Sequence, residues 1–565
     1  MKEITEDKSG SMYTYKNEKN SGKPQQGAIA RSIGDKNPNN IKNDELSNNS
    51  YSSNDDTVII HLDLSSPLYW MFFIVFLIIQ VILVILIGFY YKWDDYYTNP
   101  KSITSTSNNS LSDILYSDSS IKITGLDVYK SIKNKYRPFQ EVNIIIFLGF
   151  GLLRAFLKHH SWTSIIVTLI GGILSLELAL FMVLCWSSLF YMNWTYGRFN
   201  FQHLLDANFC SGAVIISLGA LLGKLSLPQY IILIFIETIC CSLNYTLLRE
   251  VMKIIDIGGA LTMHLFGAIF GGIFSLISFG TKNEQKRIRE SRHLGANYKS
   301  YNFALLGSLI LIAYWPSLNT CLINDDFDDD NFSMQRSKYR GVINTYLAII
   351  GSIISTFCTS PLFNQGKFKI DDILNSCFSG GIVIGGCCHL IEHYWLSLII
   401  GFLCGGVTCC LYNLLSERLQ LKGYHDTANI FFYHAIPGFL GGIMNTIFVG
   451  NLSNLLSSTD KKIVYKYVGT FLNYYYNIDS DSNSDFDGDV SIPSYAGVHF
   501  AAIWITLGIA LACGFLAGFS IKFCNCKIIL RYFNDYEFFD ISESEPFPWS
   551  NENVRVKLEY KPENY

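Results

Sequence analysis

The stretch DIGGALTMHLFGAIFGG, residues 256–272, has a close counterpart in DTANIFFYHAIPGFLGG, residues 426–442. Both follow the pattern Asp-x7-His-x6-Gly-Gly, which places the histidines at His264 and His434. Each copy lies inside or at the mouth of an apolar run, where an ionisable side chain is costly and marks a functional site by default. Two matching copies in two halves of one chain predict a site on the axis of an inverted internal repeat.

The composition is that of a membrane protein. The chain has 565 residues, of which 49% are hydrophobic and 16% charged, whereas soluble domains average about 25% charged. The net charge of −4 predicts neither nucleic-acid binding nor a strongly anionic-lipid-binding surface. Most of the fifteen cysteines lie in apolar runs, where cysteine behaves as a small hydrophobe.

Apolar stretches recur at the length of roughly 17–25 residues that a helix needs to cross a bilayer. They predict an all-α polytopic membrane protein with about twelve transmembrane helices. The transmembrane domain is expected at 67–523, between a disordered polar tail at 1–66, which cannot bury enough surface to fold, and a C-terminal tail at 524–565. The predicted spans lie near residues 68–91, 142–158, 163–190, 209–224, 229–251, 258–280, 303–319, 342–363, 373–391, 395–415, 430–449 and 500–523.

Charges in the connections predict the orientation. The connection at 282–299 is strongly basic, and cytosolic loops carry the excess of Lys and Arg, so that face and both termini are expected in the cytosol, with the chain in the plasma membrane. The opposite face has an acidic connection at 325–330 and two long extracellular segments, 92–141 and 450–499. Asn-x-Ser/Thr triplets in those outer loops are candidate glycosylation sites: Asn108, Asn193, Asn331 and Asn451.

Of eleven histidines, only His264 and His434 fall within predicted spans; the others fall at span ends, in loops or in soluble segments. A single intramembrane histidine is usually explained by a hydrogen bond to a neighbouring helix, but the repeated spacing favours a paired site. No zinc-spaced Cys/His cluster, phosphate-binding loop or nucleophile elbow is present, so we expect no catalytic residue, metal or cofactor. Two imidazoles in an apolar channel suit a small, neutral, hydrogen-bonding solute.

Several motifs in a fixed order carry a family resemblance. They include FLGFGLLRAFLKHHSWTS, DANFCSGAVIISLGALLGKLSLPQ, AYWPSLN, GKFKIDDILNSCFSGGIVIGG and FYHAIPGFLGGI, besides the first histidine motif. From about residue 140 to 450 the chain resembles the Rhesus branch of the ammonium transporter superfamily, and MHLFGAIFG favours that branch. The resemblance implies a homotrimer in the lipid bilayer, with one pore per subunit for ammonium, ammonia and methylammonium.

The resemblance also assigns roles to residues. His264 and His434 match the twin pore histidines of the family. Asp256 matches an aspartate behind the outer mouth, which either caps the following helix or supplies a negative charge for cation recruitment. The residues themselves predict a helix-start role for Asp426. The resemblance, with a glutamine common at the matching position, implies a hydrogen-bonded structural role for Glu177.

The outer mouth departs from the family pattern. Trp186 falls where one phenylalanine of a stacked outer gate is expected, and Leu318 falls where the second is expected, so the gate is predicted to be looser. Asn319 and Asn375 match polar positions near the vestibules.

The resulting hypothesis is that ammonium rests near Trp186, loses its proton there and crosses as ammonia hydrogen-bonded to the imidazoles. A cation–π contact at the mouth is worth roughly 0.5–2 kcal/mol. Three alternatives stay open at this point: a carbon dioxide channel, a non-conducting ammonium sensor or membrane scaffold, and proton-coupled secondary transport. Retention of both histidines argues against a non-conducting pore.

Overall fold

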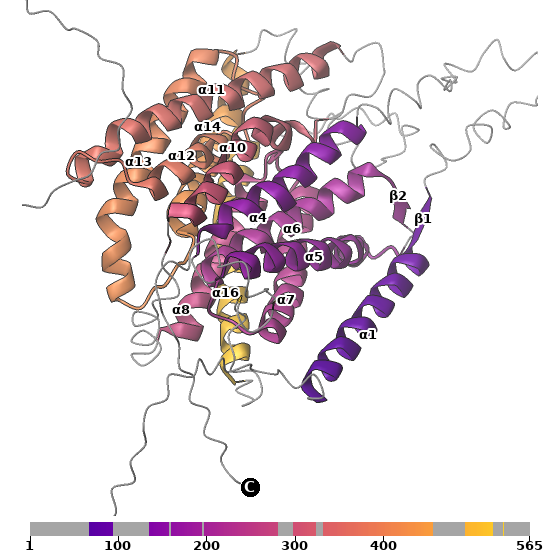
Figure 1. Cartoon of the computed structure of the whole chain (residues 1–565). Helices are drawn as coiled ribbons and strands as arrows, with labels where there is room; N and C mark the ends of the chain where they lie inside the picture. Colours follow the sequence, from indigo (N-terminus) through magenta and orange to yellow (C-terminus); the bar gives the residue numbers. More distant parts are fainter. Residues whose placement is uncertain are drawn as a thin grey trace, which may run out of the picture. The chain divides into compact units, whose positions relative to one another are not determined.

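A computed structural model describes the part of the chain that contains the predicted membrane domain (Figure 1). The predicted tail at 1–66, most of the two predicted extracellular segments and nearly all of 524–565 lie outside the described residues. The described residues are 67–93, 135–157, 160–194, 197–280, 296, 298–323, 332–455, 492–523, 535 and 539.

The described residues are almost entirely helical, with two short strands. In chain order the elements are α1 (Pro67–Tyr90), β1 (Tyr91–Trp93), a helix Lys135–Phe156 that contains η2 (Ile144–Gly149), α4 (Phe150–Leu153) and η3 (Arg154–Phe156), then α5 (Ser161–Phe190), β2 (Gly197–Phe199), α6 (Phe201–Leu221), α7 (Leu227–Thr246) with η4 (Leu247–Val251), η5 (Ala260–Leu265), α8 (Phe266–Phe279), α10 (Tyr298–Thr320), α11 (Phe332–Phe363), α12 (Ile370–Val383), α13 (Tyr394–Leu421), η7 (Phe431–Ala435), α14 (Ile436–Leu455) and α16 (Ile492–Phe523).

Ten helices of the described part are long and apolar enough to cross a membrane. The apolar helix Ile74–Tyr90 and the 14-residue α12 are shorter, and with them every predicted span has a helical counterpart. The predicted fold class of a polytopic helical membrane protein is confirmed. The inverted orientation of the two halves stays a prediction.

Several helix boundaries differ from the prediction; among them α13 ends at Leu421 rather than at 415, and α16 begins at Ile492 rather than at 500. The span predicted at 142–158 begins at Lys135. The span predicted at 209–224 begins at Phe201, because the Asn200 side chain accepts the N–H groups of the first turn and so caps the helix there. The span predicted at 373–391 is helical only to Val383 and continues in turns.

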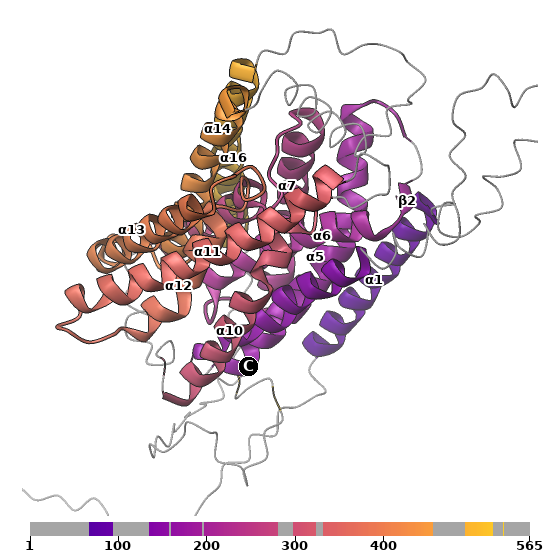
Figure 2. The ribbon, with the colours of Figure 1, turned by 90° about the horizontal axis from the view of Figure 1, so that it is seen from above.

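The two halves pack by the same scheme. In the first half α5 contacts α6 and α7, and in the second half α11 contacts α12 and α13. Figures 1 and 2 show the purple group and the salmon-to-orange group side by side, and Figure 1 shows the yellow helix α16 beside α8. The halves meet where η5 contacts η7 and α14, which is where the two histidine motifs lie.

Burial separates central helices from peripheral ones. In the most apolar window of α6, 94% of the residues are buried, against 33% in α16, so α6 lies at the centre and α16 faces outward. The outward faces are apolar, as lipid contact requires; Leu403 of α13 and Leu516 of α16 are examples.

Helix α1 contacts α5 at the periphery. The Gln80 side chain donates a hydrogen bond to the Glu177 carboxylate at 3.0 Å, which confirms Glu177 as a hydrogen-bonded polar group. Strand β1 then pairs in parallel with β2, and the Tyr91 hydroxyl donates to the carbonyl of Leu180 at 2.7 Å.

Candidate functional site

Both histidines lie in π-helical turns, His264 in η5 and His434 in η7. In the first turn the N–H of His264 donates to the carbonyl of Gly259, five residues back, at 2.9 Å. π-helical turns are rare and often occur at functional sites. Their presence at both histidines extends the repeat from sequence to backbone.

The backbone before each histidine repeats as well. Left-handed conformations occur eleven and five residues before His264, at Lys253 and Gly259, with φ of 55° and 67°. The same offsets before His434 fall on Gly423 and Asn429, with φ of 94° and 56°. The two motifs therefore follow the same chain path into their π-helical turns.

Asp256 holds the start of the first turn. Its fully buried carboxylate accepts the N–H groups of Ala260, Leu261 and Thr262 at 2.8, 3.1 and 2.9 Å, and the Thr262 hydroxyl at 2.9 Å. Donors at a helix start have no partner within the helix, so this carboxylate is their cap. The capping role is confirmed, and the recruitment of cations by its charge stays a prediction.

Asp426 holds the second turn with fewer bonds. One carboxylate oxygen accepts the N–H of Phe431 at 2.8 Å, and the other has no partner among the described residues. Burial raises the pKa of Asp426, opposed by backbone N–H groups and by the Lys224 cation. The predicted helix-start role is confirmed.

The two imidazoles are in direct contact. Their Nδ1 atoms are 3.3 Å apart, and the ring centroids are 5.4 Å apart with the planes at 21°. In this hydrogen bond one Nδ1 carries a hydrogen and donates it, and the other Nδ1 is unprotonated and accepts the bond. Trp315 of α10 stacks on His264 at 5.6 Å and on Phe378 of α12 at 5.4 Å, and Phe378 stacks on His434 at 5.6 Å. Each of these four rings therefore contacts two of the others, and we call the set His264, His434, Trp315 and Phe378 the ring circuit.

Two polar atoms of this circuit are buried without a hydrogen-bond partner among the described residues. They are Nε2 of His264 and Nε1 of Trp315. A Cβ at Gly381 would collide with the Trp315 indole, so only glycine admits the ring there. Buried polar groups are normally paired, and here two unpaired polar atoms lie on adjacent, stacked rings.

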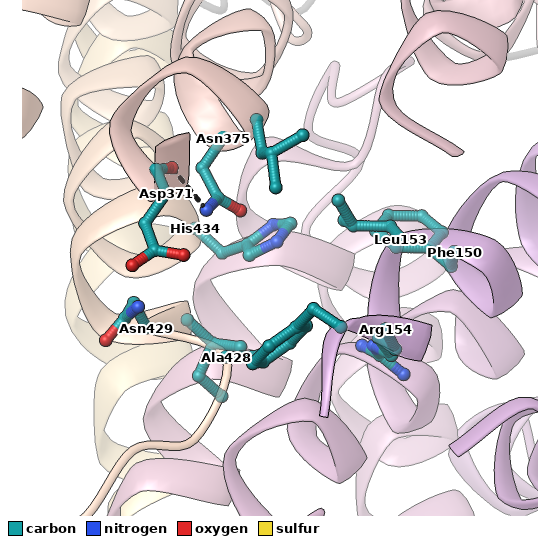
Figure 3. Close-up of a pocket in the computed structure, with 11 residues that line it drawn as sticks. Phe150, Leu153, Arg154, Asp371, Asn375, Ala428, Asn429 and His434 are labelled. Atoms are coloured by element: carbon teal, nitrogen blue, oxygen red, sulfur yellow. Dashed lines mark hydrogen bonds between the residues drawn. The ribbon is translucent and has the colours of Figure 1, made fainter. Parts of the chain in front are cut away.

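A narrow cavity opens beside His434. Its volume is about 20 Å³, which is room for one water-sized molecule. Figure 3 shows Phe150, Leu153 and Arg154 on one side and Asp371 and Asn375 on the other. The lining comprises Phe150, Leu153, Arg154, Phe156, Asp371, Leu374, Asn375, Ala428, Asn429, Ile430 and His434. Among the described residues no group of three His, Cys, Asp or Glu side chains could hold a metal ion.

The predicted polar residues have different positions. Asn375 lines the cavity, and its amide donates to the carbonyl of Asp371 at 2.8 Å. Asn319 instead lies in a buried network, where its amide donates to the Gly381 carbonyl at 2.9 Å and to the Thr345 hydroxyl at 3.2 Å. That network holds α10 against α12.

The assignment of Trp186 and Leu318 to an outer gate stays a prediction. Leu318 is buried on α10. The Trp186 indole N–H donates to the carbonyl of Ile239 on α7 at 3.2 Å, and in the described part of the chain this is the only hydrogen bond or ring contact of the Trp186 side chain. Phe209 of α6 packs against Gly259 in the first histidine motif.

Sequence reasoning missed Phe209, Trp315, Phe378 and Arg154. Phe209 and Trp315 lie in the quoted family motifs. Arg154 is a basic residue inside an apolar run, and that placement could have identified it as a candidate from the sequence. His499, predicted at a span end, lies near the start of the span Ala496–Lys522 in α16, where it is buried and accepts the N–H of Ile255 at 3.0 Å.

Comparison with known proteins identifies the family of the chain. The model of the Ammonium Transporter Family matches residues 128–537. The chain is 30% identical over 404 residues to "Ammonium transporter Rh type C" of Canis lupus familiaris, covering 70% of this chain and 80% of that protein. It is 29% identical over 395 residues to "Ammonium transporter Rh type B-A" of Xenopus laevis, covering 69% and 78%.

The fold is also similar to that of solved structures. The Rh50 protein of Nitrosomonas europaea, described as one of the Rhesus family of channels, superposes with a TM-score of 0.54 at 22% identity, covering 70% of this chain and 89% of that one. The family match extends over most of the membrane domain, and the relatives are named as transporters of the Rh type. The chain belongs to the Ammonium Transporter Family and, within it, to the Rhesus branch.

Proposed function

We propose that this multi-pass membrane protein is a channel for ammonium and methylammonium, which cross as the neutral amine between His264 and His434. The observation that carries the proposal is the contact of the two imidazoles, 3.3 Å apart, directly beside a cavity for one water-sized molecule. Ammonia has the size of water and can both donate and accept hydrogen bonds.

The cost of removing a charge from water determines whether the ammonium cation or the neutral amine passes between the histidines. Removing an ion from water costs several kcal/mol even after relaxation, and the ring circuit around the histidines is apolar. A neutral amine loses only hydrogen bonds, and each bond to an imidazole returns about 0.5–1.5 kcal/mol. The cation therefore loses its proton to water on the outer side before it reaches His264, and the amine takes a proton from water after it has passed the cavity.

We propose different residues for the outer constriction of the pore than the sequence suggested. Phe209 packs against Gly259, five residues before His264, so we assign the outer constriction to Phe209 with Leu318 rather than to Trp186. Trp186 is half-buried and retains its proposed part as a cation–π contact at the mouth. The fully buried Asp256 adds a negative charge behind the outer mouth.

The remaining expectations are part of the same proposal. They are a homotrimer in the plasma membrane with one pore per subunit, both termini in the cytosol, and glycosylated outer loops. Asn193 and Asn451 are exposed, as glycosylation needs, whereas Asn108 and Asn331 lie outside the described residues.

Uptake in a host that lacks its own ammonium transporters tests the function, with membrane current recorded in parallel. We expect methylammonium uptake that ammonium competes away. Carbon dioxide flux without methylammonium flux in proteoliposomes would favour a carbon dioxide channel. A correctly folded protein that conducts neither solute would favour a sensor or scaffold, and reversal potentials that follow pH would favour proton coupling.

Leu318→Phe tests the outer constriction. The site is almost fully buried, so we expect the larger ring to narrow the path and to reduce methylammonium uptake several-fold, at a stability cost of about 1–3 kcal/mol. Leu311→Phe, at another buried position on α10, is the matched control for overpacking. Faster uptake in Leu318→Phe than in the wild type would contradict the gate assignment.

A further inference from the structure

Arg154 is a buried cation at the end of the helix Lys135–Phe156. Its side chain is 2% exposed, and an arginine stays protonated in proteins. Buried charges are normally paired, but within the described residues the Arg154 side chain forms no ion pair or hydrogen bond, and its Nη1 is buried without a partner. Glu237 acts on it electrostatically, but its carboxylate bonds to the Ser217 hydroxyl instead.

The position of this cation ties it to the pore. Arg154 lines the same cavity as His434, and its guanidinium carbon lies 5.5 Å from the centroid of the Phe150 ring. The Phe150 ring in turn lies 6.1 Å from the His434 ring. Figure 3 shows Arg154 and Phe150 on the same side of the cavity. A solute that leaves the histidine pair through this cavity therefore passes the guanidinium.

We propose that Arg154 is a charge-selectivity residue, which excludes cations from the histidine pair at the cavity beside His434 while the neutral amine passes. The inference rests on the proposed function. Two like charges about 6 Å apart at an effective dielectric constant near 20 repel enough for roughly hundredfold exclusion. An arginine placed in a pore is a known physical means to exclude protons and cations.

Hydrogen bonding acts in the same direction as the charge. A guanidinium has only donors, so its unpartnered Nη1 can donate to the lone pair of a neutral amine. Ammonium has no lone pair and cannot accept that bond. Arg154 therefore both repels the cation and offers a partner to the amine.

The opposite side of the cavity increases the expected effect of removing this charge. Asp371 lines that side, and its carboxylate accepts the Tyr301 hydroxyl at 3.1 Å. Without Arg154 the lining of the cavity would retain this carboxylate and no cationic side chain; Lys369, which does not line the cavity, would remain the cation that acts on Asp371. The pore would then favour the charged species that the wild type excludes.

The test is the charge carried per methylammonium in proteoliposomes, from tracer flux and current measured on the same preparation of the full chain. Arg154→Met removes the charge at similar length, Arg154→Gln removes it but keeps donors, and Arg154→Lys keeps it. Arg418→Met removes an exposed charge of α13 as the matched control. We expect the ratio to rise at least about tenfold in Arg154→Met and Arg154→Gln, and to stay at the wild-type value in Arg154→Lys and Arg418→Met.

Two results would overturn the inference alone. One is a wild type that already carries one charge per amine. The other is an unchanged ratio in whichever uncharged variant reaches the membrane in folded form. A folded wild type without methylammonium flux would overturn the proposed function, and this inference with it.

Discussion

Replacing His264 and His434 together with phenylalanine is expected to reduce methylammonium flux about 5- to 150-fold. The double variant removes two hydrogen bonds to the solute, each worth about 0.5–1.5 kcal/mol, and every 1.4 kcal/mol is a factor of ten. Phenylalanine preserves the stacking on Trp315 and Phe378, so the loss reports on the imidazole nitrogens rather than on collapse of the ring circuit. Initial uptake rates per folded protein measure the effect.

The chain offers a control for this substitution. His393 is exposed and stacks on Trp395 at 6.1 Å, so His393→Phe makes the same chemical change outside the pore. We expect its flux to equal that of the wild type. Unchanged flux in a folded double variant would refute the pore role of the pair.

Asp256→Ala is expected to produce the largest loss of stability. The substitution leaves the buried N–H groups of Ala260, Leu261 and Thr262 without their acceptor, and each unsatisfied buried donor costs about 1–3 kcal/mol. The sum is on the order of 3 kcal/mol or more. The variant should yield little folded protein and unfold at a clearly lower temperature in detergent.

Asp426 supplies the comparison for this prediction, because the structure gives its carboxylate one backbone partner, the N–H of Phe431. Asp426→Ala should therefore lower the unfolding temperature less than Asp256→Ala, and Asp256→Asn, which keeps one acceptor oxygen, should be intermediate. Equal unfolding temperatures for Asp256→Ala and the wild type would show that the cap is dispensable. A stable Asp256→Asn that transports slowly would support the role of its charge in recruiting cations.

The fold was predictable because membrane spans are long apolar runs that need no tertiary information. The contact between His264 and His434 was predictable because their motifs repeat at one spacing. The backbone that holds them was not fully predictable. Glycine and asparagine tolerate a left-handed conformation, so that conformation could be predicted at Gly259 and Asn429. Lys253 adopts the same left-handed conformation as its counterpart Gly423, but nothing in the sequence predicts it for a lysine.

Most neighbours of the two histidines could not be predicted from the sequence. An aromatic residue in an apolar run does not reveal its neighbours, so Trp186 was assigned to the gate although its indole hydrogen-bonds to α7, and Phe209 was overlooked. Trp315 and Phe378 join the site only because α10 and α12 pack together. Arg154 differs, because a charge in an apolar run is a functional candidate from sequence alone.

Uptake of labelled methylammonium by the purified wild-type chain in proteoliposomes tests the claim of an amine-conducting histidine pair most directly. We predict initial rates well above those of protein-free vesicles, suppressed by added ammonium but not by added potassium. Rates equal to the protein-free leak, from a preparation shown to be folded and inserted, would contradict the claim.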